Sequence, residues 1–236
     1  MSSSSLPSIS VCIPAYNEEA TIESAIRQIE AVLQKLSCDY EIIICDDASA
    51  DRTAETIRRI AAENPRVRPI YHEKNRGIRA TFEELYAAAK KEAVFLIPAD
   101  LQWPPEILPD LVAHWDEADI IIAARVDKNY GISRSIVSAI FNFIPWMLFG
   151  ISTSDAGAVK LVRREIIEKM RIISTSPFSE AERIIRAVRA GYRLQSVPTV
   201  TRPRSAGVAQ GVRLKLLTGA AADVWRVWWD IQILGN

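Results

Sequence analysis

Acidic side chains follow the short apolar runs in the first half of this chain. Carboxylate oxygens are the ligands that divalent cations such as Mg²⁺ take in proteins, and a cation held in this way can bind phosphate groups. An arginine follows the fifth apolar run, and guanidinium groups pair well with phosphate oxygens. The pattern therefore favours chemistry on a phosphorylated substrate. The candidate residues for it lie in five segments: Pro14–Glu18, Asp46–Asp51, Glu73–Gly77, Pro98–Gln102 and Arg125.

A regular alternation of apolar runs and amphipathic stretches positions these segments. Strands are predicted over Ile9–Ile13, Glu41–Cys45, Val67–Tyr71, Ala93–Ile97 and Asp119–Ala124. Helices are predicted between them, over Glu19–Leu36, Thr53–Glu63, Arg79–Lys90 and Pro105–Trp115. This order is typical of an α/β fold with a mostly parallel, doubly wound sheet. Right-handed crossovers place the carboxyl ends of such strands along one edge, so the five segments are expected to meet there.

After Arg125 the pattern is less regular. Strands are predicted over Gly157–Val162 and Arg193–Val200, and helices over Arg164–Met170, Ser179–Ala190 and a last segment that ends near Ile231. No Ser/Gly linker or internal repeat divides the chain, so we expect one domain over residues 8–210 whose second half completes the pocket. Residues 1–7 are expected to be a disordered tail, and residues 211–236 an amphipathic C-terminal helix.

Charge is balanced overall but not along the chain. The 236 residues include 29 Lys/Arg and 29 Asp/Glu, so a nucleic-acid partner, which usually requires a basic excess, is disfavoured. Residues 156–236 hold 14 Lys/Arg against 6 Asp/Glu, and residues 1–155 have the reverse imbalance. This asymmetry suits a site that holds both a metal ion and phosphates, although charge also varies along any chain by chance.

Several common motifs are missing. No G-x-G-x-x-G follows the first predicted strand, and neither G-x-x-x-x-G-K-[ST] nor G-x-S-x-G occurs. These absences argue against a Rossmann dehydrogenase, a P-loop NTPase and an α/β-hydrolase. The three cysteines have no metal-binding spacing, and the N-terminus has no secretory signal features. We therefore expect reduced thiols and a cytoplasmic location.

Two segments raise the question of membrane contact. Residues 135–154 are uncharged, but their apolar part is short for a spanning helix and is interrupted by Pro145, so a buried or interfacial helix pair is expected. Near the C-terminus, Trp225, Trp228 and Trp229 recur at helical spacing. That spacing suits either a membrane interface or a core face.

Seven short motifs occur in the order found in family 2 glycosyltransferases. Residues 14–18 (PAYNE) resemble the family's PxYNE opening, residues 46–53 its D-D-x-S-x-D-x-T segment, and residues 75–77 its N-x-G turn. Residues 98–102 fall where the family carries D-A-D-x-Q, and residues 155–160, 180–192 and 204–207 continue in the same order. The resemblance covers about residues 8–210 and is nearest to the dolichyl-phosphate mannose synthase-like subgroup.

This resemblance implies a GT-A fold and an inverting transfer of one sugar from a nucleotide-diphosphate sugar, either a UDP- or a GDP-sugar. It also implies roles for individual residues. The nucleotide would be framed by Pro14, Tyr16 and Glu18, and its base would donate a hydrogen bond to Asp47, with Asp46 beside it. Mg²⁺ or Mn²⁺ would bind Asp100, a catalytic residue, together with Gln102. Phosphate oxygens would be neutralised by Arg125, Arg134 and Arg204.

The acceptor decides whether a catalytic base is needed. A sugar hydroxyl must lose its proton during attack, and Glu180 or Glu182 would then be the base. A polyprenyl phosphate is already an anion and needs only orientation and charge screening. The uncharged residues 135–154, the C-terminal tryptophans and the basic second half favour a polyprenyl phosphate at the cytoplasmic membrane face, with a glycan hydroxyl as the alternative.

Two positions depart from the family pattern. Pro98 stands where the first Asp of the metal motif is expected, so the cation would keep one carboxylate, one amide, the diphosphate and water. Ala209-Gln210 stands where the family often has Ser-Lys, which removes one phosphate contact. Pro98 also supports a second hypothesis, a catalytically silent protein that binds a nucleotide, a lipid head group or a partner.

Overall fold

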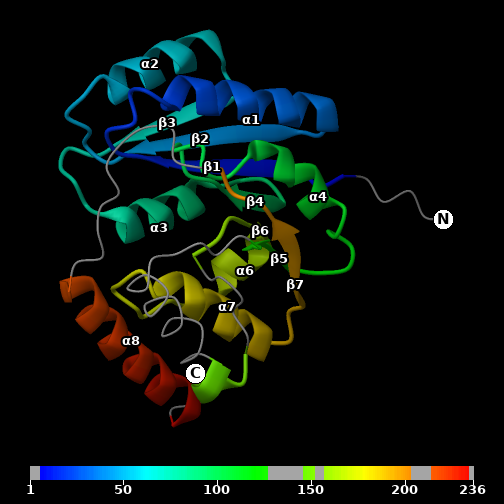
Figure 1. Cartoon of the computed structure of the whole chain (residues 1–236), viewed down its shortest axis with the longest axis vertical. Coiled ribbons are helices and arrows are strands. Elements are labelled where there is room, and N and C mark those ends of the chain that lie inside the picture. The colour runs from blue at the N-terminus through cyan, green and yellow to red at the C-terminus, as the bar shows by residue number, and fades with distance from the viewer. Residues whose placement is uncertain (1–5, 127–145, 152–156, 203–213, 234–236) are drawn as a thin grey trace.

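Strands and helices alternate along the chain, with one sheet through the middle of the molecule (Figure 1). The computed structural model describes residues 6–126, 146–151, 157–202 and 214–233. The strands are β1 (Ile9–Ala15), β2 (Tyr40–Asp46), β3 (Val67–Tyr71), β4 (Ala93–Leu96), β5 (Ile120–Arg125), β6 (Lys160–Arg163) and β7 (Leu194–Thr199). The helices are α1 (Ile22–Leu36), α2 (Thr53–Glu63), α3 (Ile78–Ala88), the short 3₁₀ helix η1 (Pro105–Ile107), α4 (Leu108–Val112), α6 (Arg164–Lys169), α7 (Ser179–Arg189) and α8 (Leu214–Gln232).

Within the described ranges, the strands form one sheet in the order β3-β2-β1-β4-β6-β5-β7. Neighbouring strands are parallel except where β6 pairs with β4 and β5. Ala15 is level with Asp46, and Asp46 with Tyr71, so β1, β2 and β3 end together. Leu96 of β4 pairs with Lys160, which therefore begins β6 at the same edge. The predicted mostly parallel α/β fold is confirmed.

The two faces of the sheet are buried under different helices. Val11 and Ile13 of β1 belong to the cluster that includes the buried face of α1, whereas Cys12 belongs to a second cluster with Leu85 of α3. In Figure 1, α1 and α2 lie above this part of the sheet and α3 lies below it. Burial on both faces explains why the strands are continuously apolar in sequence.

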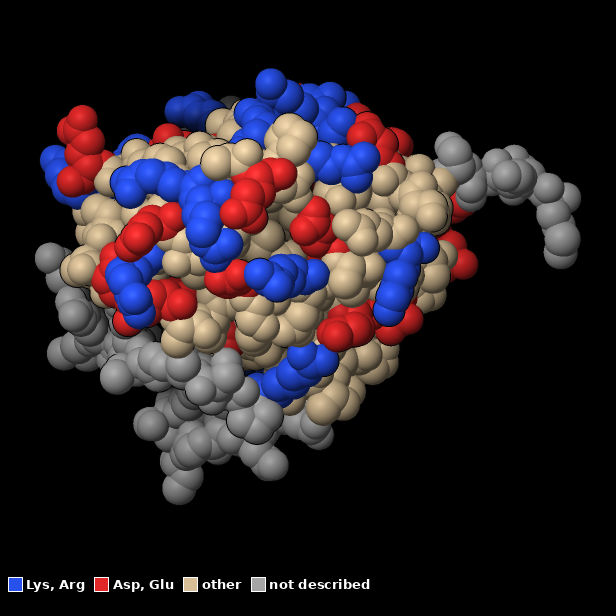
Figure 2. Space-filling view, turned by 90° about the horizontal axis from the view of Figure 1, so that it is seen from above, with Lys and Arg blue, Asp and Glu red and all other residues tan. Residues whose placement is uncertain are grey.

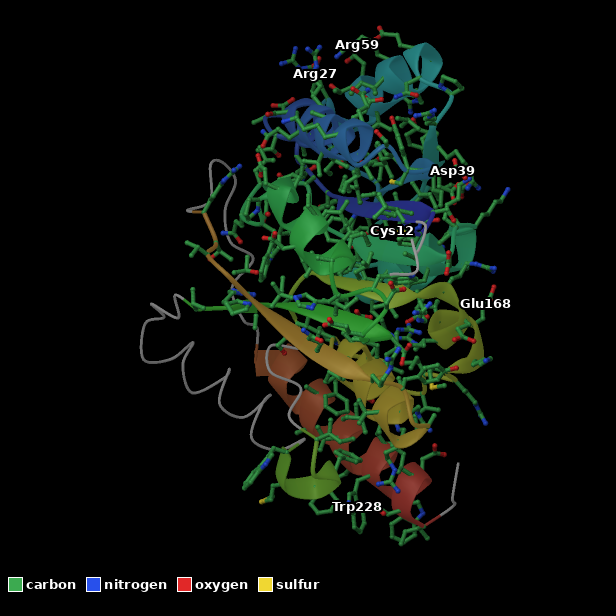
Figure 3. The ribbon with its side chains drawn as sticks, turned by 90° about the vertical axis from the view of Figure 1, so that its right-hand side faces the viewer. Cys12, Arg27, Asp39, Arg59, Glu168 and Trp228 are labelled. Atoms are coloured by element: carbon green, nitrogen blue, oxygen red, sulfur yellow. The ribbon has the colours of Figure 1, made fainter. Side chains whose placement is uncertain are left out.

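The exposed faces of α1 and α2 carry charges of both signs. Glu23 of α1 accepts hydrogen bonds from Arg27 at 2.5 Å and from Arg59 of α2 at 2.7 Å, and both arginines lie at the end of the molecule labelled in Figure 3. Viewed from this end, basic and acidic side chains are interspersed rather than gathered in one basic patch (Figure 2). Neither sign of charge therefore dominates this face.

A third apolar cluster joins α7 to α8 at the opposite end of the molecule. Phe178 and Ile185 pack with Val224, Val227 and Ile231 of α8 in this cluster. Trp228, labelled in Figure 3, packs against it as a half-buried side chain. In the described part of the chain, no helix combines the length and apolar character required to cross a bilayer.

Candidate active site

A cleft of about 390 Å³ opens at the carboxyl edge of β1, β2 and β4. Five of the predicted catalytic and binding residues lie in its walls: Pro14, Tyr16, Glu18, Asp47 and Asp100. Helix α3 forms the facing wall with Ile78, Thr81 and Phe82. Ligands of open α/β sheets bind at this kind of edge, outside the strand ends. The cleft is therefore the candidate active site.

A larger hollow of about 500 Å³ lies elsewhere, between α6, α7 and the end of α8. Its lining includes Lys169, Arg186 and Asp230, and Arg186 is already bonded to Asp230 at 2.6 Å. None of the predicted site residues that the structure describes lines it. We therefore place the chemistry in the smaller cleft.

The loop after β1 is fastened to the loop after β2 by side chains that cap backbone groups. Asn17 donates its backbone N–H to Ser49 Oγ at 2.9 Å, and its Oδ1 accepts the N–H of Ala50 at 2.8 Å. The N–H of Glu18 is donated to Thr53 Oγ1 at 2.8 Å. Asn17 and Ala48 have φ values of 56° and 59°, a left-handed conformation that is uncommon outside glycine. Such backbone at a functional edge persists only where surrounding bonds fix it, as they do here.

The neighbouring carboxylates Asp46 and Asp47 are both buried but have different partners. Asp46 accepts a hydrogen bond from Ser49 Oγ at 2.5 Å, so it shapes the loop. Asp47 Oδ1 accepts the N–H of Arg76 at 2.7 Å, and its Oδ2 accepts the N–H of Gly77 at 2.9 Å. The Asn75–Gly77 turn thus wraps around Asp47. Gly77 takes a φ of 82° there, which explains the need for glycine in this turn.

His72 is a contact of Asp47 that sequence reasoning missed. Its Nδ1 lies 2.6 Å from Asp47 Oδ1, and its Nε2 lies 3.0 Å from Glu84 Oε2 on α3. A lone histidine carries no motif, and the only available signal was its place directly after β3. That place puts it at the same edge as the predicted site residues.

Asp100 projects from the loop after β4. Its Oδ1 accepts the N–H of Gln102 at 3.1 Å, and the intervening Leu101 has a φ of 58°. The carbonyl of Gln102 accepts the N–H of Arg202 at 2.8 Å, which ties this loop to the chain after β7. Pro98, also in the cleft wall, offers no ligand atom from its side chain.

The cleft residues fit a metal ion that takes most of its ligands from substrate phosphates and water. Among the described residues, no three His, Cys, Asp or Glu side chains are grouped closely enough to hold a metal by themselves. Asp100 nevertheless supplies a carboxylate in the cleft, whose lining also includes Glu18. Mg²⁺ is typically held by one or two carboxylates plus substrate phosphates and water. Asp100 suits that arrangement, whereas Gln102, the other predicted ligand, is not among the described residues that line the cleft.

Arg125 ends β5, and its guanidinium group lies 4.8 Å from the ring centre of Trp103. This cation–π contact orients a half-buried arginine at the same edge of the sheet. The other two predicted phosphate ligands, Arg134 and Arg204, lie outside the described residues. The same holds for residues 155–156 of the predicted motifs.

Glu180, a predicted base, is buried at the start of α7. Its Oε2 accepts hydrogen bonds from Lys160 Nζ at 2.6 Å and from the hydroxyl of Tyr86 at 2.8 Å. Burial alone would raise the pKa of Glu180, but the charges of Lys160 and Arg183 and these hydrogen bonds hold it below its ordinary value. A carboxylate stabilised in this way is a weak proton acceptor.

Glu182, the alternative base, is fully buried. Its two oxygens accept the backbone N–H groups of Ile173 and Ser174, at 3.0 and 2.8 Å. Arg186 donates to it as well, at 2.8 Å. The carboxylate thus holds the segment before α7 in place, and this placement gives no support to the expected catalytic role.

The family model for glycosyl transferase family 2 matches residues 10–180 of this chain. The chain belongs to that family. The matched segment runs from β1 to the start of α7 and contains every cleft residue named above. Glu182, β7 and α8 lie beyond it.

Two curated relatives of this family 2 chain have the same name. The undecaprenyl-phosphate 4-deoxy-4-formamido-L-arabinose transferase of Aeromonas hydrophila is 33% identical over 173 residues, which is 72% of this chain and 53% of that protein. The transferase of the same name from Pseudomonas fluorescens is 32% identical over 166 residues, 69% of this chain and 48% of that protein. The chain thus spans about half the length of the curated relatives it matches.

Solved structures confirm the fold. Glucosyl-3-phosphoglycerate synthase from Mycobacterium tuberculosis, in complex with Mn²⁺, UDP and phosphoglyceric acid, superposes with a TM-score of 0.70 at 22% identity, over 95% of this chain and 78% of that one. A mannosyltransferase from Pyrobaculum calidifontis, in complex with GDP-Man and Mn²⁺, gives a TM-score of 0.66 at 18% identity, over 94% of this chain and 65% of that one. The predicted GT-A type fold of this family 2 member is therefore confirmed.

Proposed function

We propose that this chain transfers one sugar from a nucleotide-diphosphate sugar to a polyprenyl phosphate at a membrane surface. The observation that carries the acceptor class is the Lys160–Glu180 pair, which engages the carboxylate predicted to act as a base. An acceptor that is already an anion needs no such base. The name shared by the curated relatives, an undecaprenyl-phosphate transferase, supports the same acceptor class.

The cleft supplies what the donor requires. Tyr16, about one-third exposed, presents an aromatic surface beside the loop that Asp47 anchors. Asp47 Oδ2 has one backbone donor, Gly77, among the described contacts, and a carboxylate oxygen can accept a second hydrogen bond from a base N–H. Asp100 and Gln102 would hold Mg²⁺ or Mn²⁺ at the diphosphate. When bound, that cation would stabilise the charge that develops on the leaving diphosphate.

An apolar surface at the α8 end supports peripheral contact with a membrane. Trp225 and Trp229 of α8, and Ile233 directly after its end, recur every fourth residue and are 63%, 56% and 54% exposed. Trp146 and Met147, also more than half exposed, precede Phe149, which packs into the same α7–α8 cluster. Tryptophan is favoured at the interface between lipid and water. We call these five side chains the tryptophan surface and propose that it rests on the bilayer that holds the acceptor.

A product assay tests the transfer. The chain is incubated with UDP- and GDP-sugars and Mn²⁺ or Mg²⁺, with undecaprenyl phosphate in vesicles or with a soluble glycoside as the acceptor. Glycosylated undecaprenyl phosphate is the expected product, and Asp100→Asn should abolish it. Asp110→Asn, a change at an exposed carboxylate of α4, is the matched control and should retain activity. Transfer to the glycoside alone would overturn the acceptor class. Inactivity of wild type with every donor and acceptor would favour the silent binding protein that Pro98 suggests.

A further inference from the structure

His72 joins the two walls of the cleft. Asp47 belongs to the wall at the end of β2, and Glu84 is on α3, which provides the opposite wall. The His72 side chain is 2% exposed and lies between these carboxylates, with Nδ1 at 2.6 Å from Asp47 and Nε2 at 3.0 Å from Glu84. Its backbone N–H is donated to the carbonyl of Asp46 at 3.0 Å, and this bond holds the backbone of His72 in place beside β2.

The hydrogen-bond partners of His72 favour the doubly protonated form of its ring. An ionised carboxylate only accepts hydrogen bonds, and a neutral imidazole has one N–H donor. Two carboxylates on the two ring nitrogens therefore need two N–H groups, which only the imidazolium has. Protonated His72 also balances the local charge, since it and Arg76 then face Asp47 and Glu84.

No other ionisable group that contacts the ring or its two carboxylates takes over the role of the second ring N–H. Cys45 Sγ lies 3.4 Å from Nε2, but burial, followed by the nearby Glu84, Asp47 and Asp46 charges, raises the pKa of that thiol to about 12. The thiol therefore stays protonated and neutral. Arg76 donates to Glu84 Oε2 at 2.5 Å and has no proton to exchange near neutral pH. The carboxylate of Asp46 accepts a hydrogen bond from Ser49 Oγ and does not contact the ring in the described contacts.

We propose that doubly protonated His72 is a positioning residue that clamps Asp47 to α3 and so sets the shape of the nucleotide end of the cleft. This inference rests on the proposed function, because it assigns His72 to the donor side of the same site. When the ring loses its second proton, one carboxylate loses its donor. The more exposed partner, Glu84, can turn to solvent and to Arg76, so the attachment of α3 weakens while Asp47 keeps its backbone donors. Nucleotide affinity is therefore expected to be lower in the form of the protein whose His72 ring has lost this proton.

Two substitutions separate the halves of the clamp. In His72→Asn the amide lies near the position of Nδ1 and can still donate to Asp47. In His72→Gln it lies near the position of Nε2 and can still donate to Glu84. Losing a hydrogen bond to a buried carboxylate costs more than losing one to a partly exposed group. We therefore expect His72→Gln to weaken UDP or GDP binding about tenfold or more and His72→Asn to weaken it less. Both variants should lose the pH dependence of binding.

His114 is the only other histidine of the sequence and offers a matched control. It is a partly exposed residue bonded to Glu117 at 2.8 Å, and it does not line the cleft. His114→Gln should bind nucleotide as wild type does. It also leaves His72 as the single histidine, so its ring nitrogens can be followed by ¹⁵N NMR without nucleotide.

The experiment therefore has two measurements, ring protonation in His114→Gln by NMR and calorimetric binding of UDP and GDP with Mn²⁺ at several pH values. We expect a doubly protonated ring in the folded protein, and weaker nucleotide binding at any pH at which the NMR signals show that the second proton has been lost. A ring that is neutral at every pH at which nucleotide binds overturns the clamp, and this measurement leaves His72 itself unchanged. Binding in wild type that is independent of pH and unchanged in His72→Gln also overturns it, and leaves the proposed function standing. If no nucleotide binds to wild type at any pH, the proposed function fails. The role of His72 in positioning the donor site then fails with it.

Discussion

The ammonium group of Lys160 lies 2.6 Å from the carboxylate of Glu180, and both side chains are buried beside the carboxyl edge of the sheet. Lys160 begins β6 opposite Leu96, the last residue of β4, and the chain continues from Leu96 into the loop that carries Asp100. The antiparallel entry of β6 is what brings the lysine to this edge. The pair thus links the sheet to α7.

Removing one member of this pair should destabilise the fold strongly. Lys160→Met leaves the Glu180 carboxylate buried without its nearest countercharge, and we expect a loss of about 3–5 kcal/mol in the free energy of unfolding. The double variant Lys160→Met/Glu180→Gln removes both charges and should be more stable than the single variant. Urea unfolding at pH 7 measures both. Equal losses in the two variants would show that the pair is not the source of the effect.

Asp119, just before β5, should make stability depend on acid pH. Burial alone would raise its pKa, but hydrogen bonds from Arg193 and Arg163 lower it from 3.8 to about 2. Because the folded protein binds this proton less readily than the unfolded chain, the stabilisation is complete above about pH 4 and is lost as pH falls through 2. Asp119→Asn should therefore cost about 2 kcal/mol at pH 7 and less at pH 3.

Urea unfolding at the two pH values checks this expectation. Asp116→Asn, at an exposed neighbouring position, serves as the control and should show little loss at either pH. A loss in Asp119→Asn that is the same at pH 3 and pH 7 would contradict the assignment.

The tryptophan surface should govern binding to vesicles. Replacing both Trp225 and Trp229 with serine removes exposed aromatic area from one side of α8 but leaves Val224 and Val227 packed in the core. Partition onto vesicles should fall about tenfold or more, with little change in thermal stability. Co-sedimentation measures the partition. Leu6→Ser, a change at an exposed apolar residue outside this surface, should have no effect. Unchanged binding of the double variant would rule out this surface as the contact.

Local sequence patterns were sufficient to predict most of the elements. Helix α2 and strand β3 occupy the predicted residues, Thr53–Glu63 and Val67–Tyr71. Helix α1 starts at Ile22 rather than at Glu19, because Glu19 bonds to Asp51 and Arg52 of the next loop instead of entering the helix. Such contacts join residues more than 30 positions apart and leave no local signal.

The same limit applies to the site. The cleft residues follow strand ends, so the alternation of strands and helices is enough to place Tyr16, Asp47 and Asp100 at one edge. Burial of Glu180 could not be read from sequence, because its partner Lys160 is on a strand whose direction the pattern did not reveal. His72 was missed for the same reason, since only the folded sheet brings it between Asp47 and Glu84.

The central claim is that the cleft holds a nucleotide diphosphate through Asp100 and a divalent cation although Pro98 replaces a carboxylate. Thermal unfolding with UDP, GDP, dTDP and CDP, each with and without Mn²⁺, tests it most directly. A nucleotide at 100 times its dissociation constant should add about 2.7 kcal/mol to the free energy of unfolding. We predict a rise in melting temperature with one of these nucleotides that requires Mn²⁺, is lost in Asp100→Asn and is kept in Asp110→Asn. A rise that is the same without metal, or that survives in Asp100→Asn, would contradict the claim.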